Sequence, residues 1–124
     1  MTFYSGTLIA ESLRAGSILE GVALHITKIS RADVGIVDAG QPLTWTLLEF
    51  AVATDEAERL AAMLQELLNP VGGWYCDFHD DDEIFVVFHG RCFRYRRGDI
   101  ASRAEAQTYG RCVGVPEPQL DWPT

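Results

Sequence analysis

The chain has 124 residues, of which 48% are hydrophobic and 23% are charged, and its formal net charge at pH 7 is −8. This length and composition are typical of a single soluble globular domain and exclude an intrinsically disordered chain. No apolar run approaches the roughly 18–20 residues that a membrane-spanning helix needs. The acidic charge opposes binding to nucleic-acid phosphates and anionic lipid, so we expect no nucleic-acid and no membrane partner.

The cysteines and the first residues bear on the cellular compartment. The three cysteines are an odd number, without the spacing of a disulfide framework, which favours free thiols in a reducing environment. The segment from Met1 to Gly6 lacks the basic and then apolar stretches of a secretory signal. We therefore expect a cytoplasmic protein.

Two strands are predicted in the first part of the chain. Residues 22–29 place apolar side chains at every second position, which is typical of a half-buried strand, and residues 43–52 form a second strand. The loop between them, residues 30–42, is long for a compact domain and is either functional or carries a strand extension of its own. The segment 6–16 is ambiguous between a short helix and a strand.

An amphipathic helix is predicted after the second strand. Asp55 and Glu58 have the spacing of a capping box, and Asn69-Pro70 ends the helix because proline lacks the N–H that the next turn requires. Between these signals, apolar residues recur at helical spacing. They are Leu60, Met63, Leu64, Leu67 and Leu68.

Residues 74–97 contain two histidines, two cysteines, five carboxylates and four arginines. We interpret this segment as three antiparallel strands joined by turns at residues 80–82 and at His89-Gly90. Each turn sets a register, and a slip of one residue would turn every side chain of a strand to the other face of the sheet. The registers place Phe78 opposite Ile84 on the first ladder and Val86 opposite Phe93 on the second.

A second helix is predicted over residues 103–113, where Ser102 begins another capping box. Residues 116–124 are rich in proline and are expected to be extended, with Trp122 packed back onto its own domain. We therefore divide the chain into a single domain, residues 1–115, and a C-terminal tail, residues 116–124.

These elements predict an α+β fold with one domain. The order is strand, strand, helix, three strands, helix (ββαβββα), and the sheet is largely antiparallel. In the predicted registers the apolar residues of the three-stranded segment share one side of the sheet. We therefore expect both helices to pack on that one face.

The other face of the predicted three-stranded segment is the candidate binding surface. Aromatic and aliphatic side chains would lie at its centre and polar groups at its rim, which is the composition of a protein interface. The alternative is that other parts of the chain cover this face. The candidate residues are Tyr75, Asp77, His79, Phe85, Val87 and Arg94.

No motif for catalysis, nucleotide binding or metal coordination is present. The nucleophile elbow, the phosphate-binding loop and the dinucleotide fingerprint are all absent. The compact polar group formed by Asp77, His79 and Glu83 has no spacing typical of a metal site. We expect no catalytic residue, no metal and no cofactor.

The sequence leads to three hypotheses about function. The first is a small acidic cytoplasmic binding protein without enzymatic activity, which acts as inhibitor, adaptor or neutralising partner of a more basic protein, or which pairs with itself as a homodimer. The second is a small-molecule sensor or carrier domain with a pocket between sheet and helices. The third is an enzyme that uses the Asp77, His79 and Glu83 group.

Overall fold

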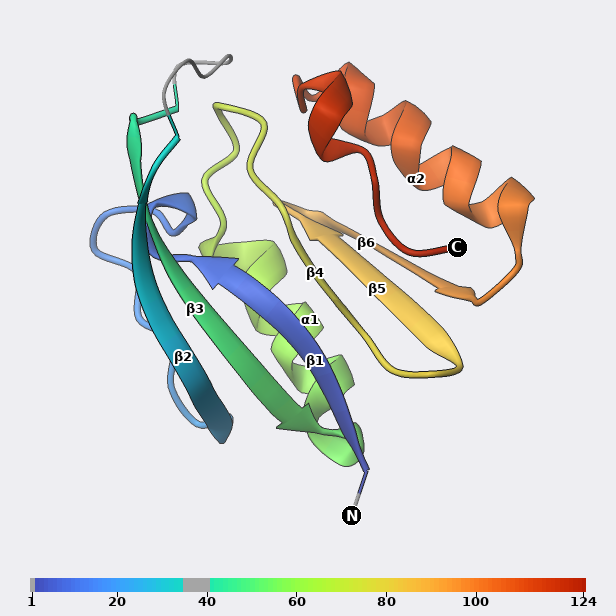
Figure 1. Cartoon of the computed structure of the whole chain (residues 1–124), viewed down its shortest axis with the longest axis horizontal. Coiled ribbons are helices and arrows are strands. Elements are labelled where there is room, and N and C mark those ends of the chain that lie inside the picture. The colour runs from blue at the N-terminus through green and yellow to red at the C-terminus, as the bar shows by residue number, and fades with distance from the viewer. Residues whose placement is uncertain (1, 35–40) are drawn as a thin grey trace.

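The computed structural model describes residues 2–34 and 41–124, which form one antiparallel six-stranded sheet and two α-helices in a single α+β domain (Figure 1). The predicted fold class is confirmed. The helices are α1 (Ala57–Leu67) and α2 (Ile100–Cys112). In the order β2-β3-β1-β4-β5-β6 across the sheet, the strands are β1 (Phe3–Ile9), β2 (Leu24–Asp33), β3 (Thr44–Ala53), β4 (Cys76–His79), β5 (Glu83–Phe88) and β6 (Arg91–Arg96).

The ambiguous N-terminal segment supplies a strand, β1, which lies at the centre of the sheet. It pairs antiparallel with β3 over its whole length and with β4 at Ser5 and Gly6. Its side chains alternate, since Tyr4 and Leu8 are buried whereas Phe3, Ser5 and Thr7 are exposed. This strand precedes the predicted order of elements and joins β2 and β3 to the other three strands.

The boundaries of the next two strands differ from the predicted ones mainly in the loop. β2 continues through residue 33, so the first part of the predicted loop is a strand extension, and it contains a bulge between Ile26 and Lys28. β3 closely matches the prediction. The rest of the predicted loop, residues 35–40, lies outside the described residues.

Neither predicted capping box forms. A short 3-10 turn, Thr54–Glu56, leads into α1, and no side chain caps this helix at Glu56. α2 begins at Ile100 rather than at Arg103, because the carboxylate of Asp99 accepts the N–H of Ser102 at 3.1 Å. The cap therefore lies earlier in the chain than the sequence pattern suggested.

The two helices pack on opposite faces of the sheet, so the prediction that they share one face is wrong. The α1 face buries Leu60 and Leu64 of α1 against β-strand residues that include Phe85, whereas the α2 face buries Ala106 against residues that include Val86. In Figure 1, α1 lies behind the sheet. The cause is strand β5, whose apolar side chains point to both faces and therefore need a cover on each side.

The C-terminal tail forms part of the layer on the α2 face. Leu120 and Trp122 are 4% and 3% exposed and belong to the same buried cluster as Ala106 of α2. The tail comes so close to α2 that a Cβ atom on Gly110 would lie 2.9 Å from the Leu120 side chain. Trp122 thus packs back onto the domain, as expected from the sequence, and the same core unites residues 116–124 with the rest.

Among the described residues, α2 and the tail cover only the β4–β6 part of the α2 face. The α2-face side chains of β1, β2 and β3 are partly or fully exposed, and we call this region the open half of the α2 face. It includes Phe3, Ser5, Thr7, His25, Ala51 and Ala53. Within the described residues, neither helix is long and apolar enough to cross a membrane.

The close approach of β1 to β4 requires a residue without a Cβ atom at Gly6. A Cβ atom there would lie 2.5 Å from the Asp77 carbonyl oxygen and 2.7 Å from the Phe78 Cβ atom. We expect Gly6→Ala to push the two strands apart and to lower the free energy of unfolding by roughly 1–3 kcal/mol. Urea denaturation measures this change. The control is Ser5→Ala in the same strand, at an exposed position, and an equal loss in both variants would contradict the steric explanation.

Candidate functional site

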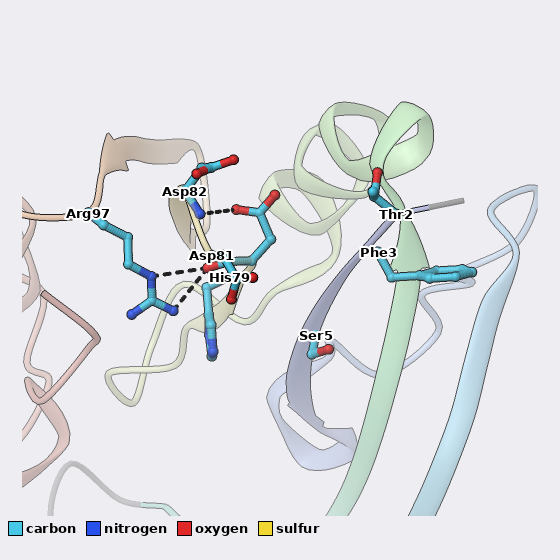
Figure 2. A pocket seen from close by; sticks show the side chains of 8 residues that line it. Thr2, Phe3, Ser5, His79, Asp81, Asp82 and Arg97 are labelled. Carbon is cyan, nitrogen blue, oxygen red and sulfur yellow. Dashed lines mark hydrogen bonds between the residues drawn. The ribbon is translucent and has the colours of Figure 1, made fainter.

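A hollow of about 380 Å³ opens where β1, the β4–β5 turn and the end of β6 meet. Figure 2 shows its side chains, which come from the first residues of the chain on one side and from the acidic turn on the other. Polar and charged groups dominate the lining, and one aromatic ring contributes apolar surface. The lining residues are Thr2, Phe3, Ser5, His79, Asp80, Asp81, Asp82 and Arg97.

The acidic turn is held in place by Asp80 and Arg97. The Asp80 carboxylate accepts the N–H groups of Asp82 and Glu83, both at 2.8 Å, as aspartate does in turns of this kind. The Arg97 guanidinium donates two hydrogen bonds to the Asp80 carbonyl oxygen, at 3.1 and 2.9 Å (Figure 2). Asp81 and Asp82 are exposed at the edge of the hollow, where their carboxylates are accessible to a cationic group.

His79 lies opposite Ser5 across the β1–β4 ladder and lines the same hollow. Its Nδ1 atom is buried and has no hydrogen-bond partner among the described residues. Burial of the ring, together with the nearby Arg97, lowers the pKa of His79 below its ordinary value. The imidazole is therefore neutral at pH 7 and offers an uncharged polar group between the carboxylates and Phe3.

Phe3 also borders a second hollow, of about 370 Å³, on the open half of the α2 face. The floor of this hollow consists of small residues of β3, Ala51 and Ala53, and its edge carries Asp55 and Glu56 from the turn before α1. The Phe3 ring is 46% exposed and lies at the edge of both hollows. An exposed aromatic ring with carboxylates on both sides can contact a side chain that carries both apolar and cationic groups.

The six residues predicted to form one binding surface lie on two different faces. Tyr75, Asp77 and His79 are on the α2 face, whereas the other three are on the α1 face. The reason is a register shift, since Phe78 pairs with Phe85 and not with Ile84. The second ladder has the predicted register, with Val86 opposite Phe93. The residues on the α1 face are Phe85, Val87 and Arg94.

Phe85 and Val87 belong to the core under α1, where they are 2% and 0% exposed. The Phe85 ring stacks on Phe78 with centroids 4.9 Å apart and meets the edge of Tyr4 at 5.3 Å. Neither side chain is accessible at the surface. The alternative interpretation of this face, that the chain itself covers it, is the one that the structure supports for these two residues.

Arg94 closes the edge of this core through ion pairs. Its guanidinium donates two hydrogen bonds to Glu83, at 2.9 and 2.8 Å, contacts Glu58 of α1, and lies 4.8 Å from the Phe85 ring centroid. The hydrogen bonds from Arg94 lower the pKa of Glu83 below its ordinary value. Glu83 therefore lies on the α1 face, away from Asp77 and His79, and the predicted group of these three residues does not form.

Tyr75 and Asp77 lie under the C-terminal tail. The Tyr75 hydroxyl donates to the Gln119 carbonyl oxygen at 3.0 Å, and its ring contacts Trp122 edge to face. Burial, with Asp121 nearby, raises the pKa of Asp77 to about 6. A carboxyl group with such a pKa is a feature of many active sites, but burial and the nearby Asp121 account for the shift here.

The chemistry that this arrangement supports is recognition of cations. The part of the chain that the structure describes contains no group of three His, Cys, Asp or Glu side chains placed to hold a metal ion. Carboxylates lie on two sides of Phe3, and the Arg97 guanidinium is hydrogen-bonded to the carbonyl oxygen of Asp80 in the turn. Of the residues predicted as a binding surface, only His79 lies in this site.

The sequence interpretation missed Thr2, Phe3, Ser5 and Arg97. A signal for the β1 residues was present, because Phe3, Ser5 and Thr7 alternate with Tyr4 and Leu8 in the manner of a strand. Arg97 gave no comparable signal. Its role depends on the register of the third strand of the meander, which brings it next to the Asp80 carbonyl group.

Comparison with known proteins adds no functional information. No protein-family model matches the chain, and neither the curated proteins nor the solved structures give a match.

The buried carboxyl group of Asp77 predicts a pH-dependent stability. Its pKa is raised from 3.8 to about 6, so its contribution to stability is fully present below pH 4 and is lost as the pH rises through 6. Asn cannot ionise, so Asp77→Asn removes the destabilisation that ionisation of this carboxyl group causes. We expect the variant to raise the free energy of unfolding at pH 7 by about 1–3 kcal/mol. Urea unfolding at pH 7 and at pH 4 measures the effect, which should vanish at the lower pH.

The matched control for Asp77→Asn is Asp81→Asn, which changes the same type of side chain at an exposed position of the same hairpin. We expect little change in this variant at either pH. A gain for Asp77→Asn that is the same at pH 4 and pH 7 would contradict the titration of this carboxyl group as its cause.

Proposed function

We propose that this chain is a small, non-enzymatic, cytoplasmic protein-binding module that binds a basic protein segment on the open half of the α2 face, around Phe3. Such a module would act as an inhibitor, an adaptor or a neutralising partner of a more basic protein. The observation that carries the proposal is the position of Phe3, which is 46% exposed and borders two hollows with carboxylates at their edges. Exposed aromatic rings of this kind are typical anchors of protein interfaces.

The charge around Phe3 supports a basic partner. Asp81 and Asp82 lie on one side of the ring, and Asp55 and Glu56 lie on the other. The chain as a whole has a formal charge of −8, which attracts a basic protein at long range and accelerates its association. The neutral His79 at the base of the first hollow does not add to this charge at pH 7.

The shape of the open half supports an extended partner. Its floor contains small side chains, Ser5, Thr7, Ala51 and Ala53, so a bound chain can approach the sheet closely.

The three cysteines, Cys76, Cys92 and Cys112, are free thiols in the structure, which agrees with a reducing compartment. A second copy of the chain is the alternative partner, and the oligomeric state in solution distinguishes the two.

The volume of the first hollow lies in the range of small-molecule sites, but its composition does not match them. Such sites are mostly apolar with a few polar groups, whereas this one carries three aspartates and an arginine. We therefore favour a protein partner over the sensor or carrier hypothesis.

The test is capture of partners from native lysate by the tagged chain and by its variants, at low and high salt. Phe3→Glu removes the aromatic anchor and adds a charge, and we expect it to weaken binding by about tenfold or more. Ile18→Glu makes the same change at a position that is 67% exposed and outside both hollows, and it should bind as the natural chain does.

The double variant Asp81→Asn/Asp82→Asn tests the electrostatic part of the proposal. It should reduce both the affinity at low salt and the dependence of binding on salt, because screening acts on exposed charges. A captured protein that binds Phe3→Glu and Ile18→Glu equally well, without salt dependence, would refute the proposed surface. Retention of the chain's own copies alone, with dimers in analytical ultracentrifugation that Phe3→Glu dissociates, would assign the surface to a homodimer.

A further inference from the structure

The outer edge of β6 is free in the described structure, because β6 is the last strand of the sheet and pairs only with β5. In an antiparallel ladder, only every second residue exchanges hydrogen bonds with the neighbouring strand. The Arg97 N–H donates to the Asp82 carbonyl at 2.9 Å, so the residues of β6 that bond to β5 are those at odd positions. The main-chain groups of Cys92 and Arg94, together with the Arg96 N–H, therefore point away from the sheet.

A groove of about 460 Å³ runs beside this edge, between β6 and the outer side of α2. Phe93 and Tyr109 form its aromatic floor, with ring centroids 5.5 Å apart, and Ala101 and Ala104 give α2 a smooth wall. Glu105 and Arg91 both border the groove, so their opposite charges offset each other there. The groove is thus suited to an aliphatic side chain that projects from a strand added to β6.

The other side of the edge carries one arginine without a salt bridge. Arg94 and Arg96 project from β6 toward the α1 face. Arg94 is paired with Glu83 and Glu58, whereas Arg96 makes no salt bridge with any residue that the structure describes. Arg91, at the start of the strand, lies on the groove side, 4.7 Å from the Phe93 ring centroid and 5.1 Å from that of Tyr109. A strand paired with β6 would direct alternate side chains toward Arg96, with which a carboxylate pairs favourably.

We propose that β6 and the groove beside α2 form a second binding site, which takes an extended acidic peptide of a partner protein as an additional strand. A glutamate or aspartate of this peptide faces Arg96, and the aliphatic residues on either side of it enter the groove beside Phe93. Main-chain hydrogen bonds to Cys92 and Arg94 supply affinity, and the alternation supplies specificity. This site is separate from the surface around Phe3, and its chemistry is the opposite.

The charges on the two sheet edges argue against a second copy of the chain as the occupant. Two β6 strands side by side would bring the arginines of both copies together. The other edge strand, β2, carries Arg31 and also Lys28, whose charge is paired with Glu49, so pairing of β6 with β2 would place basic side chains of the two strands side by side. Exposed charges of this kind discourage self-association of sheet edges, and they leave an acidic strand as the complementary occupant.

The probe that tests the site is an end-capped peptide with alternating glutamate and leucine, titrated into the full-length ¹⁵N-labelled chain. We expect the amide signals of Cys92, Arg94 and Arg96 to shift, together with those of α2. A matched peptide with N-methyl groups on its main chain has the same side chains but cannot complete the ladder, and it should bind about tenfold more weakly or not at all.

Three variants, each confirmed as folded by its NMR spectrum, complete the test. Arg96→Glu reverses the unpaired charge and Ala104→Trp fills the groove from an exposed helix position, so each should weaken peptide binding by about tenfold or more. Lys28→Glu makes the same charge reversal on the opposite edge and should change binding less than about twofold.

The proposal fails if the folded chain shows no shifts at millimolar peptide. It also fails if the shifts map to the surface around Phe3, if the N-methylated peptide binds as well as its parent, or if Lys28→Glu weakens binding as much as Arg96→Glu does.

Discussion

The sheet depends on the contact between β1 and β4, where Gly6 lets the two backbones approach more closely than any other residue would allow. β2 and β3 form one part of the sheet, and β4, β5 and β6 form the other, with β1 between them. The Tyr4 side chain spans this junction, since its ring contacts Phe78 and Phe85 and its hydroxyl donates to Glu83 at 2.8 Å. The same strand carries Phe3 and Ser5 on its other face, so the junction that unites the sheet also positions the surface around Phe3.

The sequence allowed the fold class, the two helices and the hairpin between β5 and β6 to be predicted. It did not allow the register between β4 and β5 to be predicted, because β5 offers no alternation. All five residues from Ile84 to Phe88 are buried, so a shift by one residue leaves the apolar pattern unchanged. The position of the turn decided the register, since Asp80 and Glu83 bond to each other across it and place His79 opposite Ile84.

This single shift accounts for most of what the sequence interpretation missed about the site. The predicted register between β4 and β5 was wrong by one residue. It therefore assigned to one face of the sheet side chains that lie on two opposite faces. It also implied that the apolar residues of β5 need covering on one face only. Two helices on one face followed from that expectation. The residues of the candidate site became visible only when β1 was placed next to β4, a contact between segments that are far apart in the sequence.

The net charge of the chain describes its surface incompletely. The carboxylates concentrate at the β4–β5 turn and before α1, whereas four arginines lie in and just after β6. The net charge of −8 is the sum over these two regions and the rest of the chain. An argument from net charge alone points only to basic partners, and the strand-by-strand placement of the charges is what makes a second, oppositely charged partner a reasonable hypothesis.

The burial of β5 on both faces has a consequence for the chain before it is folded. Its five consecutive apolar residues, rich in β-branched and aromatic side chains, are of the kind that associates into intermolecular β-structure when exposed. The acidic turn precedes this segment directly and Arg91 follows it closely, so charged residues flank it on both sides. Flanking charges of this kind oppose the stacking of identical segments. We therefore expect Asp80, Asp81 and Asp82 to oppose aggregation of newly made or transiently unfolded chains, independently of any role in the folded state.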